Sequence, residues 1–346
     1  MMSTLAMIAL AACANAVSVA DQSAAVEFVK MEGLMAAAFT PFNSTDVRQV
    51  NYNAVEGQAK WLAQTGVMHV LVAGTTGESV KLTIEERQQL AEEWMRHGPA
   101  LGIKIYVHVG CDALDNARQL AAHAEHIGAT GIVQMPGSYF RPQTVDQLLA
   151  ELKYVMAAAP SLAGYYYHIP SMSLSGPTKS GFKMTDLIAA NEADGHGPVI
   201  PNFAGIKFTD YDLMQLNLAH QANGGKYDMV FGRDEILMGA LTFGIKGAVG
   251  STYNYIGTQM NQLIDAVNKG DFDSARKIQT MCDHVVLDLL QNPNWSNYNV
   301  GKVIGSMISG VELGPPRLPS IPMPEAEKAA LRKALQDMGL LPATQA

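Results

Sequence analysis

Residues 69–109 read HVLVAGTTGESVKLTIEERQQLAEEWMRHGPALGIKIYVHV. Short apolar runs at 69–73 and 103–109 show no alternation with polar residues, which is typical of strands buried on both faces, as in parallel sheets. The segment between them, 83–96, has helical apolar spacing and begins with Thr83-Ile84-Glu85-Glu86, a capping-box sequence that marks a helix start. The stretch therefore predicts a strand, a helix and a second strand parallel to the first.

The same alternation continues in both directions along the chain. Apolar runs are predicted as strands at 34–38, 69–73, 103–109, 131–135, 164–167, 203–207, 229–231 and 247–250. Helices are predicted at 53–64, 83–96, 113–127, 144–159, 185–191, 213–223, 235–243 and 260–268. Gly128 follows one of these helices at the position where a glycine commonly ends a helix. Eight strands alternating with eight helices are typical of an α/β fold, the (β/α)8 or TIM barrel.

We expect the barrel to occupy residues 31–268. Further helices are predicted at 273–290, 300–308 and 325–338, with an extended break in Gly314-Pro315-Pro316-Arg317-Leu318-Pro319. Residues 269–346 are therefore interpreted as a C-terminal helical appendage that packs on the barrel, not as an independent domain.

Composition excludes several classes of protein. The 346 residues are 48% apolar and only 16% charged, with 24 Lys and Arg against 32 Asp and Glu, a net charge of −8. A mildly acidic chain without a basic patch is a poor partner for nucleic acid or an anionic membrane surface. The three widely spaced cysteines exclude a disulfide framework and a cysteine-based zinc site. No apolar run reaches the roughly 18 residues that a membrane span needs.

The first thirty residues are set apart as an N-terminal extension. Residues 5–20 are rich in Ala, Leu, Met and Val, and Ala14-Asn15-Ala16 has the form of a signal-peptidase site. A secretory signal begins with basic residues, however, and the first basic residue here is Lys30. We therefore expect a cytoplasmic protein, with a cleaved secretory signal at 1–30 as the alternative.

Active sites of (β/α)8 barrels lie at the carboxyl ends of the strands, so polar residues there are the candidates. Lys207 ends the predicted strand 203–207. Burial disfavours its charged form, and a neutral amine can attack a carbonyl to form a Schiff base. The alternative is a lysine that extends from the barrel mouth or pairs with a carboxylate such as Asp210.

Three tyrosines end the preceding predicted strand. Neighbouring strands lie about 5 Å apart, so a tyrosine here can reach Lys207 and can relay a proton to or from a substrate oxygen. By alternation Tyr165 and Tyr167 share one face, whereas Tyr166 lies on the other, where we expect it to fill the barrel wall. The following His168 is expected to be structural.

The loop after the second strand reads Gly74-Thr75-Thr76-Gly77-Glu78-Ser79. Backbone N–H groups and threonine hydroxyls between two glycines can converge on an anion. Because the Gly-Lys-Ser/Thr ending of a nucleotide-binding loop is missing, a small carboxylate fits better than a triphosphate. The alternative is an ordinary turn whose hydroxyls cap the next helix.

Two weaker features close the seventh and eighth strands, Gly232–Glu235 and Gly250–Asn254, and either could simply cap a helix. His123 and His126 resemble a metal-binding pair, but they lie on a predicted outer helix without a third ligand. We therefore predict no metal site.

Five segments together resemble the dihydrodipicolinate synthase/N-acetylneuraminate lyase family of pyruvate-dependent class I aldolases, over residues 33–319. They are GTTGES (74–79), YYYHIP (165–170), GIKFTD (205–210), GRDE (232–235) and GSTYN (250–254). Each is a weak match alone, but the full set occurs in order at predicted strand ends. YYYHIP, AVGSTYNY and GPPRLP are similar to the animal-type N-acetylneuraminate lyases of that family.

The resemblance implies roles for the matching residues. Lys207 corresponds to the Schiff-base lysine and Tyr167 to the proton-relay tyrosine. The pyruvate carboxylate is assigned to Thr75 and Thr76, and the hydroxylated sugar chain to Thr209, Gly232, Asp234, Glu235 and Ser251. No role is carried over to Arg233.

The resemblance further implies reversible aldol cleavage of open-chain N-acetylneuraminate to N-acetylmannosamine and pyruvate, with no cofactor. It also implies a homotetramer in which Tyr139 faces a neighbouring subunit. The alternatives are another pyruvate-dependent aldolase, such as dihydrodipicolinate synthase, and a non-catalytic sialic-acid-binding relative. A desolvated Lys207 beside Tyr167 argues against the latter, because simple binding has no use for a free amine.

One segment separates the two aldolase activities. Dihydrodipicolinate synthases typically carry an arginine after Tyr-x-x-Pro that binds a second carboxylate, but residues 171–176 read SMSLSG. Hydroxyl groups cannot replace a bidentate guanidinium. Asp234 and Glu235 would repel an acidic second substrate, whereas they can accept hydrogen bonds from a polyol, so the sugar substrate is favoured.

Overall fold

The structure is a computed structural model that describes residues 28–342 except 179–180, 194 and 196. Residues 1–27 of the expected N-terminal extension lie outside the described residues. Within the part that is described, no helix combines the length and the apolar character needed to cross a membrane.

The strands form a closed parallel barrel in the order β1 to β8, with β8 pairing back onto β1. They are β1 Gly33–Ala37, β2 His69–Val72, β3 Lys104–His108, β4 Gly131–Gln134, β5 Ala163–His168, β6 Phe203–Phe208, β7 Asp228–Phe231 and β8 Gly247–Gly250. The predicted (β/α)8 barrel is confirmed.

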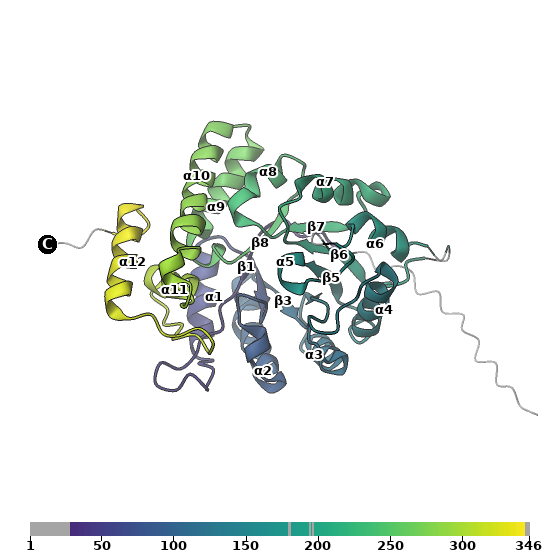
Figure 1. The fold of residues 1–346 in the computed structure, drawn as a ribbon, viewed down its shortest axis with the longest axis horizontal. Coiled ribbons are helices and arrows are strands. Elements are labelled where there is room, and N and C mark those ends of the chain that lie inside the picture. The colour runs from purple at the N-terminus through teal and green to yellow at the C-terminus, as the bar shows by residue number, and fades with distance from the viewer. Residues whose placement is uncertain (1–27, 179–180, 194, 196, 343–346) are drawn as a thin grey trace, which may run out of the picture.

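Helices surround the central strands (Figure 1). Those up to the end of the barrel are α1 Ala54–Gln64, α2 Ile84–His97, α3 Leu114–His126, α4 Val145–Met156, α5 Pro170–Ser173, α6 Met184–Asn191, α7 Leu213–Gln221, α8 Leu237–Leu241 and α9 Tyr253–Asn268. The helices that follow are α10 Phe272–His284, α11 Val300–Ser309 and α12 Glu325–Asp337.

The barrel buries both faces of its strands, which is why their sequences are apolar without alternation. One group of side chains, including Tyr165 and Tyr167, fills the barrel interior. A second and larger group, including Tyr166, lies between the strands and the helices. The predicted alternation of the three tyrosines is confirmed.

Local signals in the sequence act as predicted at two helix ends. The Thr83 hydroxyl accepts a hydrogen bond from the Glu86 N–H at 3.2 Å, and the Glu86 carboxylate accepts one from the Thr83 N–H at 2.9 Å, so the capping box is present. Gly128 follows α3 with a φ of +73°, a left-handed conformation that glycine adopts without strain.

Other helix boundaries differ from the prediction. α9 begins at Tyr253 instead of 260, although the segment that opens it contains residues of low helix propensity and Ile256 departs from helical geometry. Burial of Tyr253 and Tyr255 accounts for this early start, because packing overrides local propensity. The helix predicted at 235–243 is divided into a 3-10 turn, Asp234–Ile236, and the short α8. The short α5 was not predicted.

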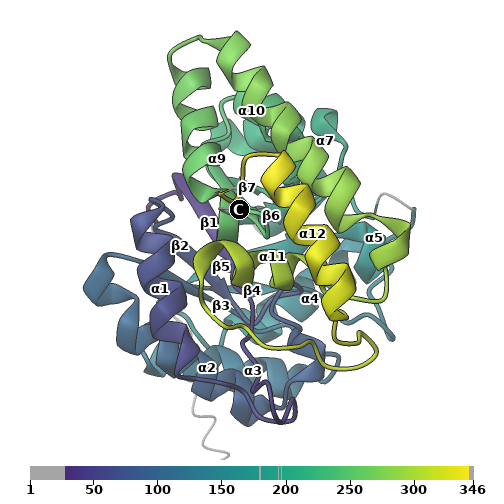
Figure 2. The same ribbon diagram turned by 90° about the vertical axis from the view of Figure 1, so that its left-hand side faces the viewer.

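The helices after the barrel pack on one side of it. α10 lies against α9, and α11 contacts both α9 and α12. Figure 2 shows α12 beside α11, with α10 reaching away above them. A π-helical turn, Val285–Leu290, continues α10 and leads toward the carboxyl ends of the strands.

Candidate active site

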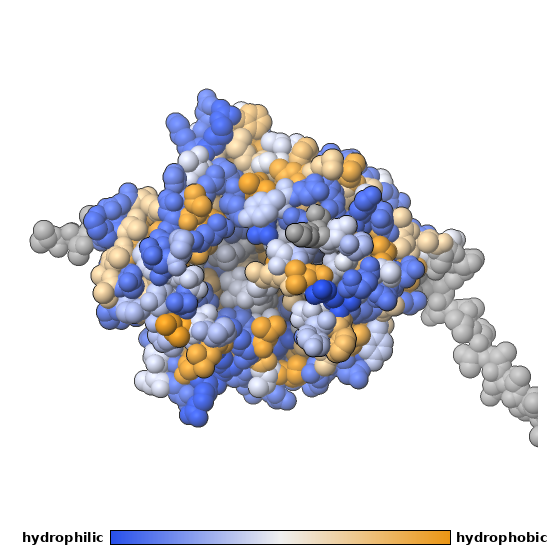
Figure 3. Space-filling model, in the orientation of Figure 1, coloured by the Kyte–Doolittle hydropathy of each residue, from blue (hydrophilic) through white to orange (hydrophobic). Residues whose placement is uncertain are grey.

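The carboxyl ends of the strands surround a cavity of about 220 Å³. The face of the molecule drawn in Figure 1 is hollowed near its middle, where side chains of neutral hydropathy gather (Figure 3). Every residue that the sequence analysis assigned to catalysis or substrate binding lines the cavity, namely Thr75, Thr76, Tyr167, Lys207, Thr209, Gly232, Asp234, Glu235 and Ser251. Their convergence follows from the barrel, since they come from the ends of β2, β5, β6, β7 and β8.

The C-terminal helices also reach the cavity. Val286 and Leu290 of the π-helical turn and the following Gln291 form part of its wall. The sequence analysis predicted a helix here but assigned it no role at the site. The apolar spacing of this segment indicated only that one face of the helix is buried, and not that it reaches the cavity.

Lys207 and Tyr167 lie directly opposite each other in the register of β5 and β6. Lys207 is only 6% exposed, and its Nζ lies 3.7 Å from the centroid of the Tyr167 ring. Among the described residues no carboxylate lies within salt-bridge distance of this Nζ. Asp210, the partner considered above, instead lies 3.9 Å from His168. The lysine is therefore a buried amine held against a phenol.

Tyr167 links this amine to the loop after β2. Its hydroxyl lies 3.4 Å from the Thr75 Oγ1. His168, the next residue, is buried on the other side of the strand, where its ring stacks on Phe208. Burial lowers the pKa of His168 to about 4, so it is a neutral residue of the wall, as expected for a structural histidine.

The loop 74–79 has a backbone that only specific contacts can hold. Ala73 and Glu78 both have left-handed φ values, +52° and +59°, which are unfavourable for residues with a side chain. Gly77 approaches the Ala38 carbonyl so closely that a Cβ would lie 3.0 Å from it. The Thr40 hydroxyl donates a 2.6 Å hydrogen bond to the Gly77 carbonyl. These contacts determine where Thr75 and its neighbour present their hydroxyls.

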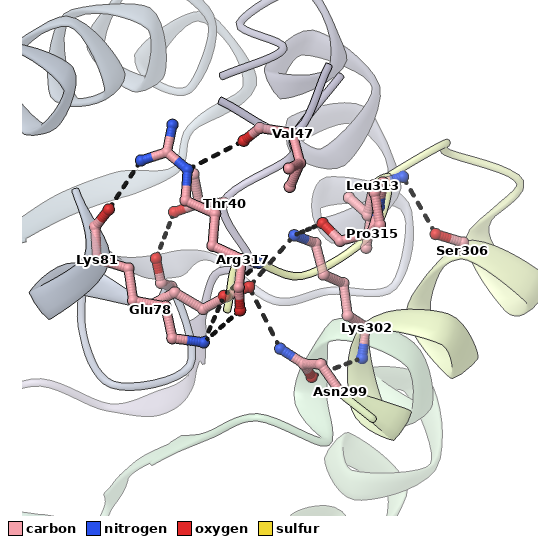
Figure 4. Close-up of polar contacts among 11 residues, drawn as sticks. Thr40, Val47, Glu78, Lys81, Asn299, Lys302, Ser306, Leu313, Pro315 and Arg317 are labelled. Carbon is pink, nitrogen blue, oxygen red and sulfur yellow. Dashed lines mark hydrogen bonds and ion pairs between the residues drawn. The ribbon is translucent and has the colours of Figure 1, made fainter. Parts of the chain in front are cut away.

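The buried Glu78 carboxylate anchors this loop to the C-terminal segment (Figure 4). It accepts hydrogen bonds from Lys81 Nζ at 2.9 Å, Lys302 Nζ at 3.3 Å, Asn299 Nδ2 at 3.4 Å and the Arg317 N–H at 3.2 Å. Burial lowers the pKa of Lys302 to about 8, although Glu78 opposes the shift. This network was not predicted from the sequence, because Asn299, Lys302 and Arg317 are more than 200 positions from Glu78 in the chain.

Asp234 is buried below the cavity wall. Its Oδ2 accepts hydrogen bonds from the Thr252 N–H at 2.9 Å and the Thr252 hydroxyl at 2.7 Å. Burial raises the pKa of Asp234 to about 6, against the opposing effect of these hydrogen bonds. Its Oδ1 lies so close to Gly250 that a Cβ there would collide with it, which explains the glycine. Asp234 thus binds Thr252 through Oδ2, while Oδ1 packs against Gly250 of the cavity wall.

Thr209 and Gly232 form a second close contact in the wall. A Cβ at Gly232 would collide with the Thr209 hydroxyl, so the glycine makes room for it. The Thr209 Oγ1 is buried and has no hydrogen-bond partner among the described residues. A buried hydroxyl of this kind is costly unless a ligand or water pairs with it.

Glu235 is already engaged at the rim by residues that the sequence analysis did not assign. The Tyr211 hydroxyl donates a 2.6 Å hydrogen bond to its Oε1, and the Arg233 guanidinium lies 3.9 Å from the same oxygen. Arg233 also lies over the Tyr211 ring, 4.3 Å from the centroid, and 3.5 Å from the Ser171 hydroxyl. The segment after β5 contains no arginine, but the loop after β7 brings Arg233, to which the sequence analysis carried over no role, to this rim.

The described residues were expected to contain no metal site. No group of three His, Cys, Asp or Glu side chains there is arranged to hold a metal ion. His123 instead lies 2.9 Å from Glu92 on the neighbouring outer helix.

Comparison with known protein families matches residues 30–338 to the dihydrodipicolinate synthetase family. The chain belongs to this family. The resemblance drawn from the five sequence segments is thereby confirmed, and the chain is a member of a family of class I, pyruvate-dependent aldolases.

Individual members of the family are similar over nearly their whole length. The N-acetylneuraminate lyase of Xenopus tropicalis is 39% identical over 291 residues, which cover 84% of this chain and 90% of the relative. That of Danio rerio is 36% identical over 310 residues, covering 89% and 96%. The solved structure of Proteus mirabilis N-acetylneuraminate lyase is 32% identical, with a TM-score of 0.81 over 90% of this chain and 100% of that one.

Proposed function

We propose that the protein is an N-acetylneuraminate lyase, which cleaves open-chain N-acetylneuraminate reversibly to N-acetylmannosamine and pyruvate. The observation that carries the proposal is the buried Lys207 amine held 3.7 Å from the Tyr167 ring, in a cavity whose wall is rich in hydroxyls and carboxylates. Similarity to lyases of this name from a frog, a fish and a bacterium supports it.

The reaction begins at Lys207. Its amine adds to the C2 ketone, and loss of water gives a protonated imine. Tyr167 takes up the proton of the C4 hydroxyl as the C3–C4 bond breaks, and the electron pair of that bond moves into the imine to give an enamine. C4 leaves as the aldehyde of N-acetylmannosamine. A proton then returns to C3, and water hydrolyses the imine to release pyruvate and the free lysine.

The remaining residues bind the two ends of the substrate. We assign the pyruvate carboxylate to Thr75 and Thr76, whose loop already places one hydroxyl at Tyr167. Thr209, Gly232, Asp234, Glu235 and Ser251 are assigned to the sugar chain. The unpaired Thr209 hydroxyl supports this, because a substrate hydroxyl in the cavity would satisfy it.

A homotetramer and a cytoplasmic location complete the proposal. Tyr139 and the neighbouring Phe140, whose exposed rings are in contact, support an interface, since contiguous exposed apolar groups are typical of surfaces that contact another protein. Sedimentation of the purified protein would test the subunit number.

The direct test is release of pyruvate from N-acetylneuraminate, measured beside condensation of pyruvate with aspartate semialdehyde. We expect the first reaction and not the second. If aspartate semialdehyde is the better substrate, the protein is a dihydrodipicolinate synthase. If neither reaction occurs and borohydride traps no pyruvate, the protein is not an aldolase.

Dihydrodipicolinate synthase activity is the second candidate, and one observation favours it. Arg233 brings a guanidinium to the rim beside Ser171, where such an enzyme needs a partner for a second carboxylate. The carboxylate of Glu235, 3.9 Å from this guanidinium, opposes the binding of a second carboxylate there.

A further inference from the structure

Arg233 is a wall residue of the cavity that the proposed reaction does not use. It follows β7 by two positions, and its side chain is 20% exposed. The guanidinium lies over the Tyr211 ring, and its Nε is buried without a hydrogen-bond partner among the described residues. Donors of this kind are costly to leave unpaired, so the group is suited to receive an oxygen from a bound molecule.

The charge of Arg233 is already compensated by the protein. The Glu235 Oε1 lies 3.9 Å from its Nη1. An anionic ligand group would approach the guanidinium against the carboxylate of Glu235, whereas a neutral oxygen would not be repelled. The site therefore favours a neutral acceptor over a second carboxylate.

The chemistry of the substrate indicates which neutral oxygen could accept a hydrogen bond from Arg233. A guanidinium only donates hydrogen bonds, and a carboxylate such as that of Glu235 only accepts them. Hydroxyls can satisfy either partner. In open-chain N-acetylneuraminate the C1 carboxylate is assigned to the threonine loop and the C2 ketone becomes the imine, so the acetamido carbonyl is the one acceptor-only oxygen left.

We propose that Arg233 is a specificity-determining residue that donates a hydrogen bond to the acyl carbonyl of N-acylated substrates. The assignment rests on the proposed lyase function and names the part of the substrate that this wall recognises. It explains why a cationic side chain stands among carboxylates at the rim. The lyase would then prefer N-acyl sugars over otherwise identical sugars that carry a hydroxyl in place of the acylamino group.

The experiment compares kcat/KM for N-acetylneuraminate and for its analogue with a hydroxyl in place of the acetamido group. Arg233→Met keeps an unbranched aliphatic side chain and removes the donors, and Arg332→Leu, an exposed change on α12, is the control. We expect Arg233→Met to lower kcat/KM for N-acetylneuraminate by about 10-fold or more, with a change below about 2-fold for the analogue. The control should alter neither substrate.

Borohydride trapping of pyruvate on each variant shows that the fold and Lys207 are intact. If Arg233→Met does not trap pyruvate, kcat/KM for the two sugars is compared in Arg233→Lys instead. This variant keeps the charge beside Glu235 but loses the planar guanidinium. Equal losses on both substrates, or no loss on either, overturn the assignment of Arg233 alone. If the unmodified enzyme cleaves neither sugar, the lyase function is refuted, and the assignment of Arg233 is refuted with it.

Discussion

Replacing Asp234 by asparagine separates its structural role from its role toward substrate. Its Oδ2 accepts both hydrogen bonds from Thr252, and its Oδ1 lies beside Gly250 at the cavity. The carbonyl oxygen of the asparagine variant can keep both Thr252 contacts, while its NH₂ group takes the place of Oδ1. The variant thereby turns the acceptor beside Gly250, a residue of the cavity wall, into a donor. Asp234→Ala is less informative, because it also removes both contacts to Thr252.

The effect on stability follows from the pKa of Asp234, which burial raises from 3.8 to about 6. A shift of about 2 units corresponds to roughly 3 kcal/mol. Because the folded state holds the proton more tightly, Asp234 contributes most to the free energy of unfolding below pH ~4, and this contribution is lost as the pH rises through about 6. The asparagine variant does not titrate, so the unmodified protein should lose roughly 3 kcal/mol relative to it over that range.

The effect on catalysis is separate. A hydrogen bond from a substrate hydroxyl to a charged acceptor contributes about 1.5–3 kcal/mol, which corresponds to a loss of about 10- to 150-fold in kcat/KM for N-acetylneuraminate. Trapping of pyruvate by borohydride should remain within about 2-fold, because Asp234 is not assigned to the pyruvate part of the substrate.

Urea denaturation between pH 4 and 7 and steady-state kinetics on the same preparations provide the assay. Asp228→Asn is a matched control, because Asp228 is another buried carboxylate, bonded to the Met31 N–H and the Tyr165 hydroxyl at the amino end of the barrel. It should leave the ratio of sugar cleavage to pyruvate trapping unchanged. A stability difference that does not vary with pH, or equal losses of cleavage and trapping in Asp234→Asn, would refute this reasoning.

Other expected outcomes test the nucleophile, the absence of a metal and the anchored loop. Lys207→Arg keeps the charge but loses the nucleophile, so the variant should fold, show no activity and give no borohydride adduct with pyruvate; an adduct on another lysine would contradict the mechanism. Activity should survive prolonged treatment with EDTA, because the protonated imine serves as the electron sink, and rescue by added zinc or magnesium would show otherwise. Glu78→Gln leaves the Lys302 ammonium, only 1% exposed, without its carboxylate, so urea denaturation should show a loss of about 3–5 kcal/mol, and a loss below about 1 kcal/mol would contradict the assigned pairing.

The barrel could be predicted because strands that are buried on both faces have apolar sequences without polar alternation. The pairing of Lys207 with Tyr167 could be predicted for a related reason, since both end neighbouring strands and the parallel register places them opposite each other. The start of α9 could not be predicted, because it is determined by the packing of Tyr253 and not by local helix propensity. Periodicity reports which face of an element is buried, and it carries no information on packing between distant segments.

The contacts among Ser171, Tyr211 and Arg233 at the rim could not be predicted from the sequence for a different reason. Ser171 lies in α5, whereas Tyr211 and Arg233 lie in the loops after β6 and β7, and the arginine and the serine are 62 positions apart in the chain. Arg233 belongs to the GRDE segment and Ser171 follows YYYHIP, but neither segment indicates that the two side chains meet. One sequence signal could have indicated a role for Arg233. It is a cationic residue between Gly232 and the acidic Asp234 and Glu235, at the strand end where the site was expected.

The anchoring of Glu78 has a consequence for how the protein is made. Its partners Asn299, Lys302 and Arg317 follow it by 221, 224 and 239 positions, so they leave the ribosome long after the loop itself and after all eight strands. Domains fold as the chain emerges, with the amino-terminal parts first. A nascent chain that ends before residue 299 has every strand of the barrel but, of the partners described for Glu78, only Lys81. The loop then keeps the Thr40 hydrogen bond to Gly77, but the Glu78 carboxylate lacks its bonds to Asn299, Lys302 and Arg317 until the last segment has been synthesised and has docked.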